Sequence, residues 1–390
     1  MFTILPKRGI SLGLGDRIGI ATTGHIKVAK KYNFFPVFAQ QSIRELNFTG
    51  RTFIDVRKDA LNALVEENYV GNSGFDGDHL KSDEEIQYAL DSGITMLTLD
   101  CSEHMNKDSS IKDQIFEQFY NKSFFVNDMP IEYSDKNELN KIVSIYASVI
   151  ERVIDVWNKF PKVNKKEVTF EVSVDETDVP TDEKTHFLIS KYIYDEGVKI
   201  DTLAPRFPGE FQKGIDYIGN IQEFKKSLIK QDKIAKYFGY RLSIHSGSDK
   251  FSIYPIIGEV TQGNYHLKTS GTSYLEAIKV VAQKDPEFFK KIWQTCLDKR
   301  EEMDKYYHLS CDPFSVPKDL SPTEYLKNPD ARQTLHVSYM FVLNPQYDFR
   351  EKFIEILTKY QNEYHQNAAN HIEKHVKELK VEEKIHKQKN

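Results

Sequence analysis

Short apolar runs and longer amphipathic stretches alternate along the chain from residue 17 to residue 283. The short runs predict strands at residues 17–22, 36–41, 74–79, 95–102, 168–174, 201–207, 240–246 and 264–270. A helical pattern follows each strand, at residues 25–32, 56–69, 82–92, 136–159, 181–196, 220–238, 248–260 and 273–283. This alternation is typical of a parallel sheet. Eight repeats of it predict an α/β fold of the (β/α)₈ type, the TIM barrel.

Two segments do not follow the alternation. Residues 103–135, after the fourth predicted strand, are polar and aromatic, and we expect them to form an insertion over the barrel mouth. After about residue 285 the pattern is helical, with proline breaks. The sequence therefore predicts a catalytic barrel over residues 1–284 and a C-terminal helical extension over residues 285–390. The extension is expected to pack on the barrel, as a lid or as a homo-oligomer contact.

Side chains of a strand alternate between its two faces. The apolar face packs against the helices, so the opposite face points into the barrel. In the strand at 168–174, Phe170 and Val172 face the helices and Glu171 faces inward. The same alternation turns further ionisable residues inward: Asp100, Arg206, His245, His266 and Lys268. Branched apolar residues normally fill a barrel interior, and an unpaired buried charge is strongly destabilising. A functional site is therefore predicted here.

Imidazoles and carboxylates from separate strand ends are typical ligands of a divalent metal. Asp78 and His79 end the third predicted strand, and His245 lies near the end of the seventh. We expect His79, His245 and Glu171 to bind one divalent ion. Such donors accept Zn, Mn, Ni or Co, so the sequence leaves the metal open.

Composition narrows the range of partners. The net charge is −5 and the only basic cluster lies in the last dozen residues, which argues against nucleic acid. Neither a run of 18 apolar residues nor an apolar N-terminal segment occurs, so no membrane span and no signal peptide are expected. Three widely spaced cysteines predict a reducing, cytoplasmic location. The glycines of residues 13–19 have the wrong spacing for a dinucleotide fingerprint and no predicted strand before them, so no nucleotide cofactor is expected.

Several motifs resemble known enzyme families. The strand ends Asp78-His79, Leu99-Asp100-Cys101-Ser102 and Ile244-His245-Ser246-Gly247-Ser248 resemble those of the class II, metal-dependent aldolases. A closer match is the tagaturonate epimerase family, which includes ketose 4-epimerases acting on fructose and tagatose. Its motifs here are Gly15-Asp16-Arg17-Ile18-Gly19, Thr23-Gly24-His25, Gly77-Asp78-His79, and residues 245–250 and 266–274. The resemblance implies a metal-dependent epimerase that inverts the hydroxyl carbon β to the ketone of a keto-uronate or ketohexose.

The chain departs from the aldolase pattern at two places. The loop at residues 204–211 has no histidine where aldolases supply a third metal ligand, so this ligand is Glu171 or His266, or both. Asp249 stands where aldolases bind a phosphate. Its charge would repel a dianion, which favours an unphosphorylated substrate.

The carbon β to a ketone carries a C–H that the ketone does not acidify. Without a nicotinamide, we expect it to be inverted by retro-aldol cleavage and re-addition. Asp78 is the candidate base, and Glu171 or Asp100 is the candidate second acid or base. The expected substrate contacts are Lys268, Arg206, Lys250, Ser246, Asp249 and His25. The histidines of the C-terminal extension form no HExxH motif and are expected at the surface: His308, His336, His365, His371 and His375.

Two alternatives stay open. A class II aldolase acting on an unphosphorylated sugar acid would use the same residues but release free fragments. A barrel without catalysis that supports an aldolase subunit would have lost metal ligands, and this chain retains Asp78, His79, Glu171 and His245. The sequence does not decide between tagaturonate and a neutral ketohexose as substrate.

Overall fold

A parallel β-sheet forms the centre of the computed structural model, which describes residues 2–177, 179–269 and 271–384. Within these residues the sheet has nine strands, in the order β2-β1-β11-β10-β9-β8-β5-β4-β3. Their bounds are β1 Ser11–Leu14, β2 Phe35–Phe38, β3 Gln41–Ser42, β4 Asp76–Leu80, β5 Met96–Asp100, β8 Thr169–Val174, β9 Thr202–Pro205, β10 Arg241–Ile244 and β11 Tyr265–Thr269. Every strand pair in this sheet is parallel, as the sequence predicts.

The sheet curls so that its two ends approach each other. The strands at the ends of the order, β2 and β3, are separated by only two residues in the chain. In addition, a parallel bridge joins Val37 of β2 to Gly74, just before β4. The α/β class and the parallel sheet are therefore as predicted.

The first strand lies earlier than predicted. Residues 17–20 form bends, and the strand is Ser11–Leu14, all four residues of which are buried. The carboxylate of Asp16 accepts hydrogen bonds from the backbone N–H groups of Ile18, Gly19 and Thr22, which holds this segment in a turn. A strand thus contains Gly13 and precedes Gly15 and Gly19. The predicted strand at 264–270 is β11, with Ser270 outside the described residues.

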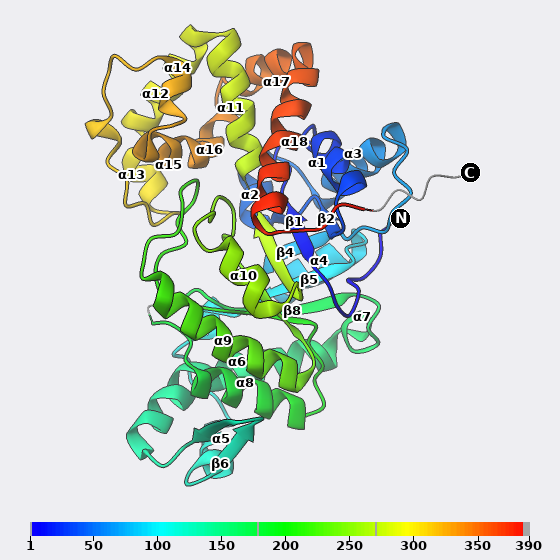
Figure 1. The fold of residues 1–390 in the computed structure, drawn as a ribbon, viewed down its shortest axis with the longest axis vertical. Coiled ribbons are helices and arrows are strands. Elements are labelled where there is room, and N and C mark those ends of the chain that lie inside the picture. The colour runs from blue at the N-terminus through cyan, green and yellow to red at the C-terminus, as the bar shows by residue number, and fades with distance from the viewer. Residues whose placement is uncertain (1, 178, 270, 385–390) are drawn as a thin grey trace.

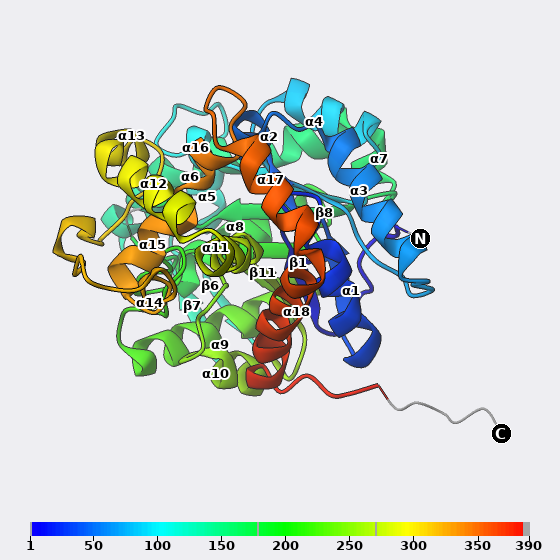
Figure 2. The same cartoon turned by 90° about the horizontal axis from the view of Figure 1, so that it is seen from above.

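Helices cover the outer face of the sheet (Figures 1 and 2). They are α1 Thr22–Lys31, α2 Ile43–Thr49, α3 Phe53–Glu66, α4 Asp83–Asp91, α6 Lys136–Lys159, α7 Pro161–Asn164, α8 Glu183–Asp195, α9 Ile221–Phe238, α10 Tyr254–Thr261 and α11 Thr272–Lys284. Local sequence sets their starts: Ser82 and Glu85 form a capping box at α4, and Asp182 caps α8.

The segment after β5 does not cover the mouth of the sheet, contrary to our expectation. It forms η1 Ser102–His104, α5 Lys112–Phe119 and a hairpin of β6 Ser123–Val126 and β7 Met129–Glu132. Phe119, Val126 and Ile131 are buried, and the segment packs against α6, α8 and α9 in the outer layer. In Figure 1 it lies at the end of the molecule opposite the C-terminal helices.

The C-terminal helices form a second hydrophobic core together with α11. They are α12 Pro286–Asp298, α13 Arg300–Asp304, η2 Pro313–Ser315, α14 Pro322–Tyr325, α15 Pro329–Val337, α16 Tyr339–Val342, α17 Arg350–Lys359 and α18 Gln361–Glu378. Tyr274 and Ile278 of α11 belong to this core, along with Phe289, Leu335 and Phe353. The last helix, α18, returns to the sheet and packs between α1 and α11 (Figures 1 and 2). Among the described helices, none is both long and apolar enough to cross a membrane.

Candidate active site

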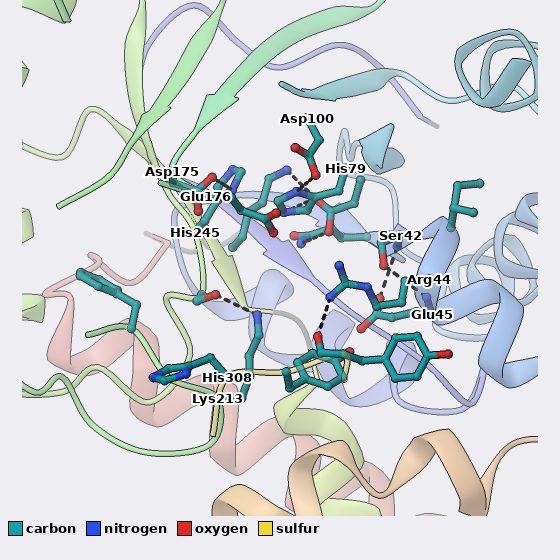
Figure 3. Close-up of a pocket in the computed structure, with 18 of the residues that line it drawn as sticks. Ser42, Arg44, Glu45, His79, Asp100, Asp175, Glu176, Lys213, His245 and His308 are labelled. Atoms are coloured by element: carbon teal, nitrogen blue, oxygen red, sulfur yellow. Dashed lines mark hydrogen bonds and ion pairs between the residues drawn. The ribbon is translucent and has the colours of Figure 1, made fainter. Parts of the chain in front are cut away.

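A cavity of about 790 Å³ opens at the carboxyl ends of the central strands. Two groups of side chains line it (Figure 3). Imidazoles and carboxylates gather on one side: His79, Asp100, Asp175, Glu176 and His245. Cationic and aromatic residues lie on the other: Arg44, Lys213 and His308. Asp78, Tyr306 and Tyr307 also line the cavity. The carboxyl edge of a parallel sheet is where α/β enzymes place their chemistry.

Lys268 of β11 holds three carboxylates together at the base of this cavity. Its Nζ lies 3.0 Å from Asp76 Oδ2, 2.7 Å from Asp78 Oδ1 and 2.7 Å from Glu171 Oε1. All four side chains are buried. Burial opposes a charged lysine, but the three carboxylates outweigh it and raise the pKa of Lys268 well above its usual value. Lys268 is therefore an ammonium ion that neutralises part of this acidic cluster.

The carboxylates around Lys268 differ in how readily they take up a proton. Burial raises the pKa of Asp76 to about 7, in spite of the ammonium beside it. Burial also disfavours the charged form of Asp78, but Lys268, together with His79 and His245, lowers the pKa of Asp78 below its usual range. Asp78 is thus ionised at neutral pH, and it lines the cavity. Such a carboxylate can accept a proton from a substrate hydroxyl.

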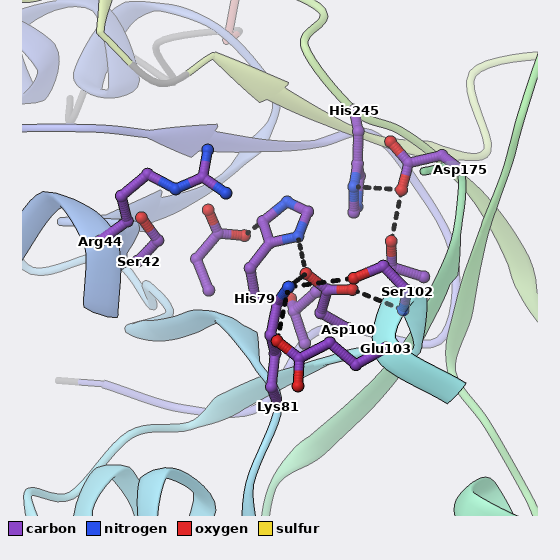
Figure 4. Close-up of polar contacts among 12 residues, drawn as sticks. Ser42, Arg44, His79, Lys81, Asp100, Ser102, Glu103, Asp175 and His245 are labelled. Atoms are coloured by element: carbon purple, nitrogen blue, oxygen red, sulfur yellow. Dashed lines mark hydrogen bonds and ion pairs between the residues drawn. The ribbon is translucent and has the colours of Figure 1, made fainter. Parts of the chain in front are cut away.

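His79 and His245 face each other across the acidic side of the cavity (Figure 4). Their ring centroids are 5.0 Å apart. Nδ1 of His79 lies 3.4 Å from Asp100 Oδ2, and Nδ1 of His245 lies 3.3 Å from Asp175 Oδ1. Burial opposes protonation of both rings, but the carboxylates outweigh it. They raise the pKa of His245 to about 10 and the pKa of His79 above its usual value.

Donor atoms suited to a divalent ion converge around His79. One atom each of His79, Asp100 and Glu176 lies within 4.8 Å of the other two. Nδ1 of the opposing His245 is buried and makes no hydrogen bond of good geometry to any residue that the structure describes, although Asp175 Oδ1 lies 3.3 Å away. Imidazole and carboxylate donors with an excess of negative charge fit a divalent cation. This part of the cavity therefore meets the requirements for a metal.

Glu171 and His266 do not line the cavity, and the expectation that one or both bind the metal beside His79 stays a prediction. Glu171 Oε1 lies 2.9 Å from His245 Nε2 and accepts from Thr98, while its Oε2 accepts from Thr202 at 2.6 Å. Its oxygens are therefore already engaged. His266 lies deeper, with Nδ1 2.9 Å from Ser11 Oγ. Burial lowers the pKa of His266 to about 3.

Three expected substrate contacts lie elsewhere. Lys250 is fully buried and its Nζ donates to the backbone carbonyls of Gln212, Ile215 and Ser248. Asp249 turns toward the C-terminal helices, and His25 is buried beneath α18 with no hydrogen bond to either ring nitrogen. The loop after β10 reverses direction because Ser246 and Asp249 adopt left-handed backbone angles, with φ of 48° and 60°.

The other expected contacts do line the cavity: Lys268, Arg206 and Ser246. Several lining residues were missed by the sequence reasoning: Arg44, Asp175, Glu176, Lys213, Tyr306, Tyr307 and His308. His308 was expected at the surface, as were His336 and His375, which are fully buried. Asp76, next to Lys268, was also missed, although its spacing of two residues from Asp78 indicates the same strand face.

A buried lysine with acids and imidazoles at the carboxyl edge of a parallel sheet defines an α/β enzyme of the kind that moves protons on small polar substrates. Comparison with known proteins identifies the family. Residues 3–379 match the tagaturonate epimerase family, UxaE. The tagaturonate/fructuronate epimerase of Thermotoga maritima is 38% identical over 386 residues, covering 94% of this chain and 80% of that protein.

A solved structure agrees with this match. The native crystal structure of the fructuronate-tagaturonate epimerase UxaE from Cohnella laeviribosi has a TM-score of 0.92 at 38% identity, covering 97% of this chain and 83% of that one. This chain belongs to the tagaturonate epimerase family and is an epimerase. The family predicted from the sequence motifs is thereby confirmed.

Proposed function

We propose that this epimerase interconverts tagaturonate and fructuronate, inverting the hydroxyl carbon β to the ketone by retro-aldol cleavage and re-addition. The observation that carries the proposal is the division of the cavity into an acid and imidazole side around His79 and a cationic side around Lys213. The first side suits proton transfer at a sugar hydroxyl, and the second suits the carboxylate of a uronate. The names of the two relatives support the same substrates.

The fold belongs to the same proposal. If β2 and β3 are two halves of one strand, the curled sheet is a closed (β/α)₈ barrel, and the segment at residues 103–135 is an insertion after its fourth strand. The parallel pairing of β2 with β1 and of β3 with β4 supports this arrangement.

A divalent ion is part of the proposal. His79, Asp100 and Glu176 would hold it, with His245 on the opposite side of the same space. When bound, the ion supplies a Lewis acid for the ketone and its neighbouring hydroxyl. Zn, Mn, Ni and Co all suit these donors.

The bond-breaking step begins at Asp78. Its carboxylate accepts the proton of the hydroxyl on the carbon β to the ketone. That carbon becomes an aldehyde, and the electron pair of the carbon–carbon bond passes to the ketone fragment as an enediolate. Lys268 keeps Asp78 ionised at 2.7 Å and stays in place throughout. The walls of the cavity retain both fragments.

Re-addition requires the aldehyde to turn and present its other face. The enediolate then re-forms the carbon–carbon bond, and the new alkoxide takes a proton from a group on that side. Asp100 lines the cavity and Glu171 does not, which favours Asp100. Burial opposes ionisation of Asp100, but the His79 ring 3.4 Å away holds its pKa below the usual range, so Asp100 is ionised in the free enzyme and must first receive the proton that Asp78 accepted. Atoms and charge then balance, because the proton that leaves the hydroxyl at Asp78 is the one that Asp100 returns to the new alkoxide.

The cationic side of the cavity would hold the carboxylate of the substrate. Lys213 Nζ donates to Ser246 Oγ at 2.8 Å, and burial lowers the pKa of Lys213. Arg44 is exposed at the entrance, where it donates to the backbone carbonyl of Tyr306 at 3.3 Å. A substrate carboxylate beside Lys213 would favour its charged form and raise its pKa.

The test uses purified protein with tagaturonate, fructuronate, tagatose and fructose, followed by proton NMR. We expect interconversion of the uronates, its loss in EDTA, and its recovery on addition of a divalent metal. A reaction in deuterium oxide should leave the inverted carbon without deuterium, because its C–H bond is never broken. Deuterium at that carbon would rule out the retro-aldol route. His79→Ala should abolish turnover, while His104→Ala, half-buried on η1 outside the cavity lining, should not.

The aldolase alternative is separated by trapping the fragments. An alcohol dehydrogenase or a hydrazine reagent present during turnover consumes free aldehyde. An epimerase retains its fragments and should lose little substrate to the trap, whereas an aldolase should lose it stoichiometrically. A non-catalytic supporting subunit would show neither reaction.

A further inference from the structure

The loop after β10 meets the last helix at a cluster of potential metal ligands far from the cavity lining. His371 and His375, one turn apart on α18, face Asp249 of the loop. One donor atom from each of the three residues lies within 4.8 Å of the other two. Asp249 and His375 are 4% and 0% exposed. None of the three residues lines the large cavity.

The distances within this cluster match the spacing of ligands around one ion. Two ligands about 2.0–2.1 Å from a tetrahedral zinc lie about 3.4 Å apart. Oδ1 of Asp249 lies 2.9 Å from His371 Nε2 and 3.7 Å from His375 Nε2, so the observed distances bracket that value. The two rings have centroids 4.7 Å apart and planes inclined at 62°, so they are not stacked.

Two of the donor atoms have no hydrogen-bond partner among the described residues. Oδ1 of Asp249 and Nε2 of His371 are both buried, and neither bonds to any residue within 2–177, 179–269 or 271–384, although the two atoms are 2.9 Å apart. The ring N–H direction therefore does not point at the carboxylate oxygen. Buried polar atoms without partners are rare in proteins and call for an explanation. An ion between them supplies one.

The surrounding groups orient the donors as they do in known metal sites. His371 Nδ1 lies 3.5 Å from Glu276 Oε1 on α11, and His375 Nδ1 donates to the backbone carbonyl of His371 at 2.8 Å. Metal-binding histidines usually present their second nitrogen to a carboxylate or a carbonyl. Because Nδ1 of His375 carries the proton, the lone pair of the ring is on Nε2, where it accepts the Asp249 N–H at 3.0 Å, and a bound ion would replace this hydrogen bond.

Each carboxylate of the cluster keeps one oxygen for the site. Arg332 lies 2.9 Å from Asp249 Oδ2 and Lys279 lies 3.2 Å from Glu276 Oε2, so both cations pair with the other oxygens. Oδ1 therefore stays available. Phe251 and Tyr254 pack against His375, which keeps the site dry on that side.

We propose that Asp249, His371 and His375 form a second divalent-metal site, separate from the catalytic cavity, which takes zinc or a similar ion and fastens α18 to the loop that carries His245. The donor set is two imidazoles and one carboxylate, one ligand fewer than a tetrahedral zinc site. Its role is structural, because none of its residues lines the cavity.

The test separates this site from the cavity by working in the His79→Ala variant, which lacks a cavity donor. The protein is stripped with EDTA, and Zn²⁺ alone is titrated by calorimetry. We expect one zinc per chain. His79→Ala/His371→Gln should bind it at least about 100-fold more weakly, and His79→Ala/Glu276→Gln about 10- to 100-fold more weakly. The matched control, His79→Ala/His104→Gln, removes an unrelated imidazole and should bind as His79→Ala does.

Two further readouts do not depend on activity. Co²⁺ in place of Zn²⁺ should give visible absorption bands in His79→Ala that are lost in the His371→Gln double variant. Zinc should raise the melting temperature of the first protein and leave that of the second unchanged. Circular dichroism of the metal-free proteins shows whether both are folded, and Asp249→Asn serves in place of His371→Gln if that variant is not. The proposal is wrong if His79→Ala takes up no zinc, or if the double variant binds it equally well.

Discussion

The ammonium of Lys268 lies 3.0 Å from the carboxylate of Asp76, and both side chains are buried. Two more carboxylates share the same ammonium, so this lysine neutralises a site that would otherwise be strongly acidic. Removing one partner of a buried ion pair leaves uncompensated charge, which typically costs about 3–5 kcal/mol.

We therefore expect Lys268→Met to lower the free energy of unfolding by about 3–5 kcal/mol, measured by urea denaturation at pH 7.5. Lys290→Met is the control, because its side chain is 65% exposed and its pair with Glu287 lies at the surface. That change should stay within about 0.5 kcal/mol. Adding Asp76→Asn to Lys268→Met should restore part of the loss. A Lys268→Met protein as stable as the wild type would contradict this account of the cluster.

Asp78→Asn tests the proposed base. The amide keeps the shape of the side chain and can still contact Gln40, but it cannot accept a proton from a hydroxyl. We expect the turnover number for uronate epimerisation to fall by about 10²- to 10⁴-fold in protein that is still folded. The melting temperature should also fall, because Lys268 loses one of its three carboxylate partners. Asp128→Asn, whose side chain is 79% exposed, is the control. Turnover within threefold of the wild type would assign the base to another residue.

Lys213→Met tests whether Lys213 binds the carboxylate of the substrate. A lost charge-assisted hydrogen bond should reduce kcat/KM for tagaturonate by roughly 10- to 100-fold. The value for tagatose, which has no carboxylate, should change much less. Arg206→Met is the comparison, since Arg206 already has Glu210 at 3.5 Å. Equal losses for the two sugars in Lys213→Met would mean that Lys213 does not bind the carboxylate.

His186 links stability to pH at a place remote from the cavity. Its Nδ1 donates to Gln231 and its Nε2 accepts from Tyr240, and burial lowers its pKa to about 4. Between pH 6.5 and 4 the imidazole of His186 is protonated in the unfolded chain but not in the folded chain. The stabilisation is therefore complete above pH 6.5 and is lost as the pH falls toward 4.

From these values the wild type should lose about 2 kcal/mol between pH 7.5 and pH 5 through His186 alone. His186→Gln cannot titrate, so its stability should fall by that much less over the same range in urea denaturation. His104→Gln is the control, and it should keep most of the wild-type pH dependence. Parallel curves for the wild type and His186→Gln would show that burial of this imidazole does not matter.

Gly24 of α1 touches the backbone of α18. A Cβ at this position would lie 2.5 Å from the carbonyl oxygen of His365 and 3.0 Å from Ala368. Alanine favours a helix over glycine by about 1 kcal/mol, but overpacking against a rigid backbone costs about 1–3 kcal/mol. We expect the clash to win, so that Gly24→Ala lowers the melting temperature. Lys27→Ala on the exposed face of the same helix should not lower it.

Regular periodicity made most of the sheet predictable. Every residue of the strands that carry Glu171 and Lys268 is buried, and a strand has only two faces. Alternation therefore places both side chains on the inward face, opposite the apolar residues that face the helices. Alternation says nothing about depth, however. Glu171 is therefore inside the sheet but below the cavity, and its oxygens are taken up by neighbouring strands.

Residues beyond the strand ends were less predictable, since loop geometry decides where they go. Asp249 follows His245 by four residues, yet the left-handed turn at Ser246 sends it to the other side of the loop. Tyr307 and His308 reach the cavity from a segment far along the chain, which local patterns cannot reveal. At the start of the sheet, the carboxylate of Asp16 accepts hydrogen bonds from the backbone N–H groups of Gly19 and Thr22. A strand at residues 17–22 would have used these groups to pair with its neighbours.

The tyrosines and histidine at positions 306–308 line one side of the cavity but contribute none of the groups assigned to bond breaking. The groups proposed for bond breaking lie on other stretches of the chain. Redesign for a different sugar can begin at this short segment while the reactive machinery is left intact.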